Sequence, residues 1–342
     1  MKEAIVEAGP KVHIIDSPTP KPGRGQVVIK VIFSGSNPKD WKVPEWVGGE
    51  PINQGDDISG IVHEVGEGVS EFKPGDRVAA FHEMRTPHGS WAEYALSWAH
   101  TTFRLPPKVS FEEGAALPLA AMTAAQGLFA KLRLPEPWLP ATRPIPLVIY
   151  GASSAVGYYA LQLALKANIH PLICVAGRAQ SHVESLIDRS KGDTIVDYRN
   201  GNEAVVKGLR DALKGQKLEY AYDAVSEKNS YQNIGEVLDH HSGHITFVLP
   251  GGEYKEIPDT IDKTITRVGD AHGTPDDLKD FSSVYFRYFS KGLEEGWFKA
   301  QPQEVVPGGL EGVQKALEGL KEGKASAVKY IFKIADTPGA GK

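Results

Sequence analysis

The sequence predicts an α/β protein in which a β-rich amino-terminal region precedes a doubly wound parallel sheet. Residues 1–115 carry short runs of branched apolar residues separated by Gly and Pro turns. From residue 147 onward, short apolar segments alternate with helical ones, which is typical of a parallel sheet with crossover helices. The length of 342 residues is sufficient for two domains, each with its own core.

The first part of the chain is expected to be all β, with strands at residues 26–33, 60–65 and 77–81. Residues 111–132 predict helix, with Pro118 opening a second segment, and the proline-rich residues 134–146 predict an irregular surface excursion. The alternating part predicts strands at 147–150, 172–176, 194–197, 218–225 and 244–249, and helices at 156–167, 181–190, 202–214 and 229–239. The remaining residues predict a strand at 264–269, helices at 276–296 and 308–322, and a strand at 327–334.

Composition and charge exclude several classes of function. The chain has a net charge of −5 and no basic face, which argues against a nucleic-acid partner. Its most apolar long window, residues 115–132, contains Pro118 and Lys131 and is therefore not expected to span a membrane. The first residues lack an apolar signal core, and a single cysteine allows no internal disulfide. We therefore expect a cytoplasmic protein without a membrane or nucleic-acid partner.

Residues 147–157 (LVIYGASSAVG) predict a short buried strand, a tight turn and the start of a helix. Such a turn directs unpaired backbone N–H groups and the positive end of a helix toward a phosphate. The expected ligand is the pyrophosphate of a dinucleotide, held by Gly151, Ser153, Ser154, Ala155 and Val156. Ser154 stands where the G-x-G-x-x-G pattern has a glycine, so an ordinary strand–helix turn without a ligand is the alternative.

The second strand–helix turn indicates which dinucleotide binds. NAD-specific folds place an acid at the end of the second strand, whereas NADP sites supply a cation there. Here the strand is followed by Gly177 and Arg178 without an acid. Arg178 can pair with a 2′-phosphate, with Ser181 and Tyr198 adding hydroxyl groups, and a solvated surface arginine is the alternative. The missing acid favours NADPH.

Five further motifs extend over the first half of the chain. They are residues 36–42 (SNPKDWK), 55–62 (GDDISGIV), 75–78 (GDRV), 89–94 (GSWAEY) and 115–124 (AALPLAAMTA). Together they resemble the medium-chain dehydrogenase/reductase superfamily, in its zinc-free quinone oxidoreductase and enoyl reductase branch. The resemblance implies a GroES-like catalytic domain made of residues 1–118 and 275–342, and a Rossmann NADP-binding domain made of residues 119–274.

Three shorter segments give a closer likeness. They are residues 150–154 (YGASS), 196–199 (VDYR) and 218–223 (LEYAYD). Together with the proline-rich excursion they resemble fungal trans-acting enoyl reductases of polyketide pathways, the lovastatin type.

The same resemblance implies that the protein contains no metal. Zinc alcohol dehydrogenases of this superfamily bind catalytic zinc through a Cys after the second strand and a His-Glu pair. Here Asn37 or its neighbours stand at the first position and Asp56 and Asp57 at the second, while a structural zinc needs four thiolates and this chain has one cysteine. The histidines within residues 240–244 are expected to be solvated in a turn.

At the reacting end, the resemblance places Lys42, Asn37 and Thr123 around the nicotinamide as catalytic residues, with Leu249 and Pro250 contacting it through backbone groups. Lys42 would hold the nicotinamide ribose or the developing enolate, and Thr123 the ribose or the substrate carbonyl. The alternatives are a surface lysine and a helix hydroxyl bonded to its own backbone.

These implications combine into an NADPH-dependent, zinc-independent reductase of activated C=C bonds in an enoyl thioester or enone, working beside a polyketide synthase. The substrate can be a small molecule or carrier-bound, and the chain a monomer or a dimer. Two alternatives remain open. One is an NADPH quinone oxidoreductase, and the other is a non-catalytic NADPH-binding protein.

Overall fold

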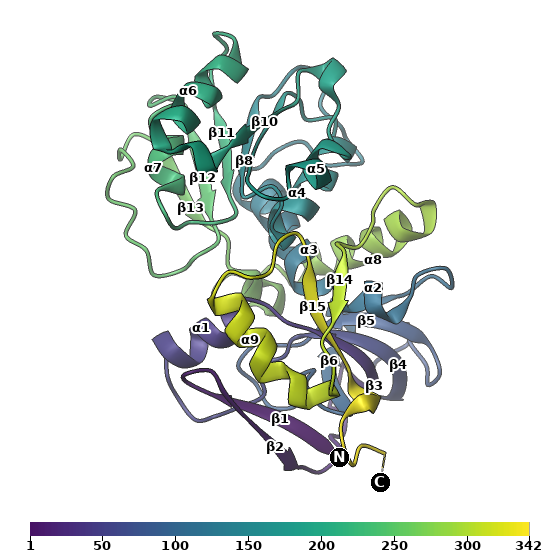
Figure 1. Ribbon diagram of the computed structural model, residues 1–342. Helices are drawn as coiled ribbons and strands as arrows, with labels where there is room; N and C mark the ends of the chain where they lie inside the picture. The colour runs from purple at the N-terminus through teal and green to yellow at the C-terminus, as the bar shows by residue number, and fades with distance from the viewer. Residues whose placement is uncertain (342) are drawn as a thin grey trace. The chain divides into compact units, whose positions relative to one another are not determined.

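The computed structural model describes residues 1–341, which divide into two compact units. The first unit comprises Met1–Leu119 together with the chain from Gly269 onward, and the second comprises Ala120–Val268. The boundary after Leu119 falls inside helix α3 (Pro118–Ala125), which begins at the proline that the sequence indicates. Figure 1 labels most of the helices and strands in both units.

The first unit is built on a seven-stranded sheet within the described residues. Its strand order is β14-β15-β3-β4-β5-β7, with β6 paired to β3, and β14 and β15 are the pair that runs parallel. The strands are β3 (Gln26–Gly35), β4 (Asp57–Val65), β5 (Arg77–Phe81), β6 (Tyr94–Trp98), β7 (Thr102–Arg104), β14 (Gln303–Val305) and β15 (Lys329–Lys333). A separate antiparallel pair joins β1 (Lys2–Glu7) to β2 (Lys11–Asp16). Val27, Ile29 and Val31 of β3 pack with Trp91 and Phe332 in the core of this unit.

Helices of the first unit depart from the expected pattern in two places. The helices are α1 (Lys39–Trp46), α2 (Phe111–Ala115), α8 (Lys279–Glu295) and α9 (Val313–Lys321). The expectation of an all-β first part was wrong at α1, because its buried residues are Asp40 and Pro44 and give no apolar periodicity. The helix expected at 308–322 begins as a 3₁₀ turn, Gly309–Gly312, because Gly308 and Gly309 both have positive φ.

The second unit confirms the doubly wound parallel sheet. Its six strands run parallel in the order β10-β9-β8-β11-β12-β13. They are β8 (Leu147–Tyr150), β9 (Leu172–Ala176), β10 (Thr194–Asp197), β11 (Tyr220–Asp223), β12 (His244–Phe247) and β13 (Asp262–Ile265). The strand order reverses between β8 and β11, which is the point where such sheets bind dinucleotides at the carboxyl ends of their strands.

Several elements of this unit are shorter than expected. The helices are α4 (Ala155–Lys166), α5 (Gln180–Glu184), α6 (Asn202–Leu213), α7 (Ser230–Gly235) and the π-helix η2 (Gln126–Lys131). The helix expected at 181–190 ends at Glu184, and the following chain turns where the Asp188 carboxylate accepts the N–H of Ser190. The strand expected at 218–225 ends at Asp223, whose carboxylate accepts the N–H groups of the next turn. No helix in residues 1–341 is both long and apolar enough to cross a bilayer.

Candidate active site

The turn between β8 and α4 has the geometry of a phosphate-binding turn. Gly151 has φ of +78°, and a Cβ there would lie 2.6 Å from Cγ2 of Val225. A Cβ on Gly157 would lie 2.2 Å from the Gly151 carbonyl oxygen, so the first turn of α4 packs directly on the strand end. Both positions therefore require glycine.

Ser154 explains why the middle glycine of the familiar pattern is absent. It is the N-cap of α4, and its Oγ accepts the N–H of Gly157 at 3.1 Å. Serine is among the preferred N-cap residues, so the substitution stabilises the helix start without obstructing the turn. Ser153, Ala155 and Val156 are half-buried around this end of the helix, and α4 has no acid in its first turn. Their backbone N–H groups fit an anion such as a pyrophosphate.

The carboxyl end of β9 brings together two of the residues expected around the 2′-phosphate, Gly177 and Tyr198. Tyr198 lies against Gly177, since a Cβ on that glycine would be 2.6 Å from the tyrosine ring. Tyr198 remains 47% exposed, and Arg178 and Ser181 are also exposed. An exposed aromatic ring and an exposed cation, Tyr198 and Arg178, therefore lie beside the end of β9.

The sequence analysis did not give a role to the acid and cation that border this edge. Asp197 ends β10 and is paired in register with Ala176, the last residue of β9. Arg199 donates through Nε to Asp197 Oδ1 at 2.9 Å and through Nη2 to Oδ2 at 2.6 Å. This hydrogen bonding holds the pKa of Asp197 at about 2, so its negative charge is matched by a cation. Asp197 and Arg199 are two residues apart, and this spacing is the sequence signal that could have revealed the pair.

The first unit places Asn37 in a buried polar network that the sequence did not indicate. Asn37 is 3% exposed, and its Nδ2 donates to Asp57 Oδ2 at 2.7 Å. Lys329, itself 4% exposed, donates from Nζ to Asn37 Oδ1 at 2.6 Å and to Asp57 Oδ2 at 2.8 Å. Both ends of the Asn37 amide are therefore engaged inside this unit.

The other oxygen of Asp57 holds the start of helix α3. Asp57 Oδ1 accepts the backbone N–H of Leu119 at 2.7 Å, in the first turn of the helix that carries Thr123. A carboxylate at a helix N-terminus is favourable because of the helix dipole. Gly35 permits the close packing, since a Cβ there would lie 2.3 Å from the Ala115 carbonyl and 3.0 Å from Cε of Lys329.

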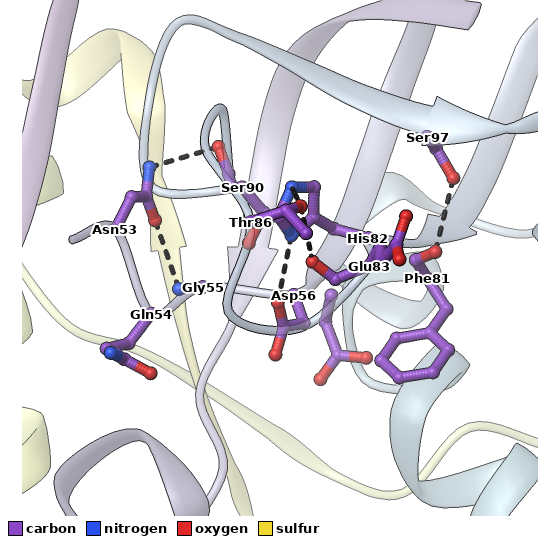
Figure 2. A network of polar contacts seen from close by, with 12 residues as sticks. Asn53, Gln54, Gly55, Asp56, Phe81, His82, Glu83, Thr86, Ser90 and Ser97 are labelled. Atoms are coloured by element: carbon purple, nitrogen blue, oxygen red, sulfur yellow. Dashed lines mark hydrogen bonds and ion pairs between the residues drawn. The ribbon is translucent and has the colours of Figure 1, made fainter. Parts of the chain in front are cut away.

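Asp56 is held in a second buried network, which Figure 2 shows around His82. His82 Nδ1 lies 3.0 Å from Asp56 Oδ1, and Lys39 Nζ forms an ion pair with Asp56 and lies 3.1 Å from Asp40 Oδ1. Burial alone would raise the pKa of Asp56, but the Lys39 charge and the His82 hydrogen bond outweigh it and lower the pKa. Burial raises the pKa of Asp40 to about 7.

These two networks bear on whether the residues fit a zinc ion. Asp56 and Asp57, at the positions of the superfamily's His-Glu pair, already satisfy Lys39 and Lys329. The part of the chain that the structure describes also holds no group of three or more His, Cys, Asp or Glu suited to a metal. Both carboxylates are thus paired with separate lysines, an arrangement unlike two ligands that share one zinc ion.

Lys42 lies on α1, and its ammonium group is close to two indole rings. Its Nζ is 4.8 Å from the ring centroid of Trp46 and 5.6 Å from that of Trp41, within cation–π range. Trp46 is 55% exposed and Lys42 is half-buried, so this end of the helix presents a cation on an aromatic surface.

Thr123 belongs to the second unit, where it lies in α3 with 5% of its surface exposed. Its backbone carbonyl accepts a hydrogen bond from Tyr222 Oη at 2.8 Å. Leu249 and Pro250 follow β12, and the Leu249 carbonyl accepts from the hydroxyl of Tyr254. Ser226 holds the backbone just before this turn, because its Oγ accepts the N–H of Val248 at 3.0 Å.

Sequence comparisons place the chain in a family. The trans-enoyl reductase fsr4 of Gibberella fujikuroi is 60% identical over 315 residues, which cover 91% of this chain and 92% of that protein. The chain belongs to the trans-enoyl reductases. A second relative, the trans-enoyl reductase resD of Aspergillus sclerotiorum, is 29% identical and is matched over 97% of this chain and 100% of its own length. Residues 23–107 match the alcohol dehydrogenase GroES-like domain.

Two solved structures share the fold of this trans-enoyl reductase. The CurK enoyl reductase superposes with a TM-score of 0.75 at 19% identity, covering 96% of this chain and 98% of its own. The quinone oxidoreductase from Coxiella burnetii superposes with a TM-score of 0.74 at 21% identity, covering 97% and 99%. These structures confirm the expected GroES-like and Rossmann architecture. The 60% identical relative and the GroES-like match confirm the medium-chain dehydrogenase/reductase superfamily and show that the protein is an oxidoreductase.

Within this trans-enoyl reductase, the residues that sequence reasoning missed are mostly buried partners of those it named. Lys329 and Tyr222 contact Asn37 and Thr123 from positions 292 and 99 residues away. No local pattern indicates such partners, because the fold alone brings them together.

Proposed function

We propose that this protein is an NADPH-dependent, trans-acting enoyl reductase that reduces the conjugated double bond of an enoyl thioester. The observation that carries the proposal is the phosphate-binding turn of residues 151–157 in a chain 60% identical to a trans-enoyl reductase. The family supplies the reaction class, and the turn supplies a place for the dinucleotide.

The choice of NADPH is supported by the carboxyl end of β9. No acid ends that strand, Arg178 is exposed beside it, and Tyr198 is 47% exposed. The neighbouring Asp197 is paired with Arg199, which offsets the repulsion it would exert on a 2′-phosphate. We propose that Arg178 pairs with the 2′-phosphate and that Ser181 and Tyr198 donate to it.

At the reacting end, NADPH when bound supplies the hydride for the β-carbon of the enoyl group. Lys42 and Thr123 are proposed to donate to the nicotinamide ribose or to the carbonyl oxygen that gains negative charge. We propose a different role for Asn37 from the catalytic one expected, because its amide is engaged by Asp57 and Lys329. It helps to hold the carboxylate that anchors α3.

The proposed partner is a polyketide synthase, whose carrier domain would present the enoyl chain as a thioester. This rests on family membership and on the relatives' name, trans-enoyl reductase. A thioester carbonyl conjugated with the double bond makes the β-carbon electrophilic without a metal, in agreement with the ion-paired Asp56 and Asp57.

The test is a comparison of cofactors and acceptors with the purified protein. NADPH and NADH oxidation would be followed with a crotonyl thioester of N-acetylcysteamine, with an enone and with a benzoquinone. We expect oxidation of NADPH with the thioester, and a much slower rate with NADH. Turnover of the quinone alone would support a quinone oxidoreductase, and NADPH binding without any turnover would support a non-catalytic protein.

A further inference from the structure

Tyr222 lies within the central sheet of the second unit and contacts a helix through its hydroxyl. The side chain is fully buried on β11, beside Ile149 of β8 and Thr246 of β12 in the sheet register. Its Oη donates to the backbone carbonyl of Thr123 at 2.8 Å, in a buried hydrogen bond. The contact ties the carboxyl-terminal end of α3 to a strand at the point where the sheet order reverses.

A glycine makes room for this contact. A Cβ on Gly127 would lie 2.0 Å from Cε2 of Tyr222 and 2.7 Å from its hydroxyl oxygen. Gly127 belongs to the π-helix η2, where the Leu132 N–H donates to the Gly127 carbonyl at 2.9 Å in the i to i−5 pattern. Such segments are rare and occur frequently at functional sites. The tyrosine ring therefore packs directly on the helix backbone, one turn after Thr123.

The Tyr222 hydroxyl is a donor over the whole neutral pH range. Burial, together with the nearby Asp223 carboxylate, raises the pKa of Tyr222 well above its usual value. Loss of the hydroxyl would leave the buried Thr123 carbonyl without this donor, and a net cost follows. Because the Cα–Cβ bond follows the backbone, fixing the Thr123 carbonyl also fixes the position from which its side chain projects.

We infer that Tyr222 is a positioning residue for the reaction, which holds the Thr123 backbone where its side chain can contact the nicotinamide end of NADPH. The inference rests on the proposed function, which gives Thr123 that contact. Tyr222 acts through the helix backbone, whereas Thr123 makes the contact.

The experiment uses Tyr222→Phe, which keeps the ring that packs on Gly127 and removes only the hydroxyl. Tyr220→Phe is the matched control, because Tyr220 lies two residues earlier on β11 and its ring stacks on His244. Two properties are measured: the fluorescence of the nicotinamide during NADPH titration, and single-turnover reduction of the crotonyl thioester. Tyr222→Phe should lower the turnover by about two- to tenfold, as expected for one lost hydrogen bond. It should also lower the bound-state emission. The NADPH dissociation constant should change less than about twofold, since the phosphate contacts remain.

A double-mutant cycle with Thr123→Val separates positioning from general support of the fold. In the Thr123→Val background, Tyr222→Phe should change neither emission nor turnover further. Additive losses, or equal effects of Tyr222→Phe and Tyr220→Phe, would overturn the inference. If wild-type protein fails to reduce the thioester, the proposed function fails, while the emission measurement still decides the role of Tyr222.

Discussion

Replacing Lys329 by Met should lower the free energy of unfolding of the first unit by about 3–5 kcal/mol. Lys329 is 4% exposed, and its Nζ donates to Asp57 at 2.8 Å and to Asn37 at 2.6 Å. Its loss leaves the fully buried Asp57 carboxylate without a cation and the Asn37 oxygen without a donor. Removing one member of a buried pair costs more than the pair contributes, because the remaining charge stays desolvated.

The control for this prediction lies on the same strand. Lys333 of β15 pairs with Asp336 at 3.3 Å, and both side chains are exposed, so Lys333→Met should cost about 0–1 kcal/mol. Urea unfolding followed by tryptophan fluorescence measures both variants, since Trp91 is buried in the core of this unit. Adding Asp57→Asn to Lys329→Met should recover part of the loss, because the network becomes neutral. Equal losses for the two single lysine variants would refute the reasoning.

Three other predictions concern the cofactor, the reaction and the pH dependence of stability. Arg178→Ala should weaken NADPH binding by about 1.5–3 kcal/mol and leave NADH binding nearly unchanged in parallel titrations, whereas an equal loss for both would exclude a 2′-phosphate contact. Lys42→Ala should lower single-turnover enoyl reduction by about 10²–10³ with little effect on NADPH affinity, as for a lost oxyanion donor, and the reverse pattern would assign Lys42 to the cofactor ribose. Burial, opposed by Lys39 and reinforced by Asp56, raises the pKa of Asp40 to about 7. Folding therefore favours its protonated form. The free energy of unfolding should fall as the pH rises from about 4 to about 7, and urea titrations should show a smaller fall for Asp40→Asn.

The features that sequence analysis predicted correctly are those set by neighbouring residues. The strand, the Gly151 turn and the start of α4 follow from local pattern, and Pro118 opens α3 because its fixed φ suits a first helical turn. The parallel sheet followed from repetition of such units. Even the missing middle glycine has a local reason, since Ser154 caps the helix.

The features that sequence analysis missed depend on contacts between distant segments or on buried polar faces. Helix α1 was overlooked because it buries Asp40 rather than an apolar stripe. The contact between Lys329 and Asn37 was not foreseen, because Lys329 approaches from the far end of the chain. A lysine at the start of a strand gives no sign in the sequence that its ammonium group is buried. The role of Tyr222 is equally invisible, because a tyrosine within a strand is most simply a core residue.

The central claim is that this chain transfers a hydride from NADPH to the β-carbon of an enoyl thioester. It is tested most directly with NADPH deuterated at C4 of the nicotinamide, using each of the two stereoisomers in turn. Mass spectrometry and NMR of the product from the crotonyl thioester then locate the label. The account predicts one deuterium at the β-carbon from one of the two isomers, with the α-carbon labelled only from solvent. Oxidation of NADPH without deuterium in the product, or no saturated thioester from either isomer, would contradict it.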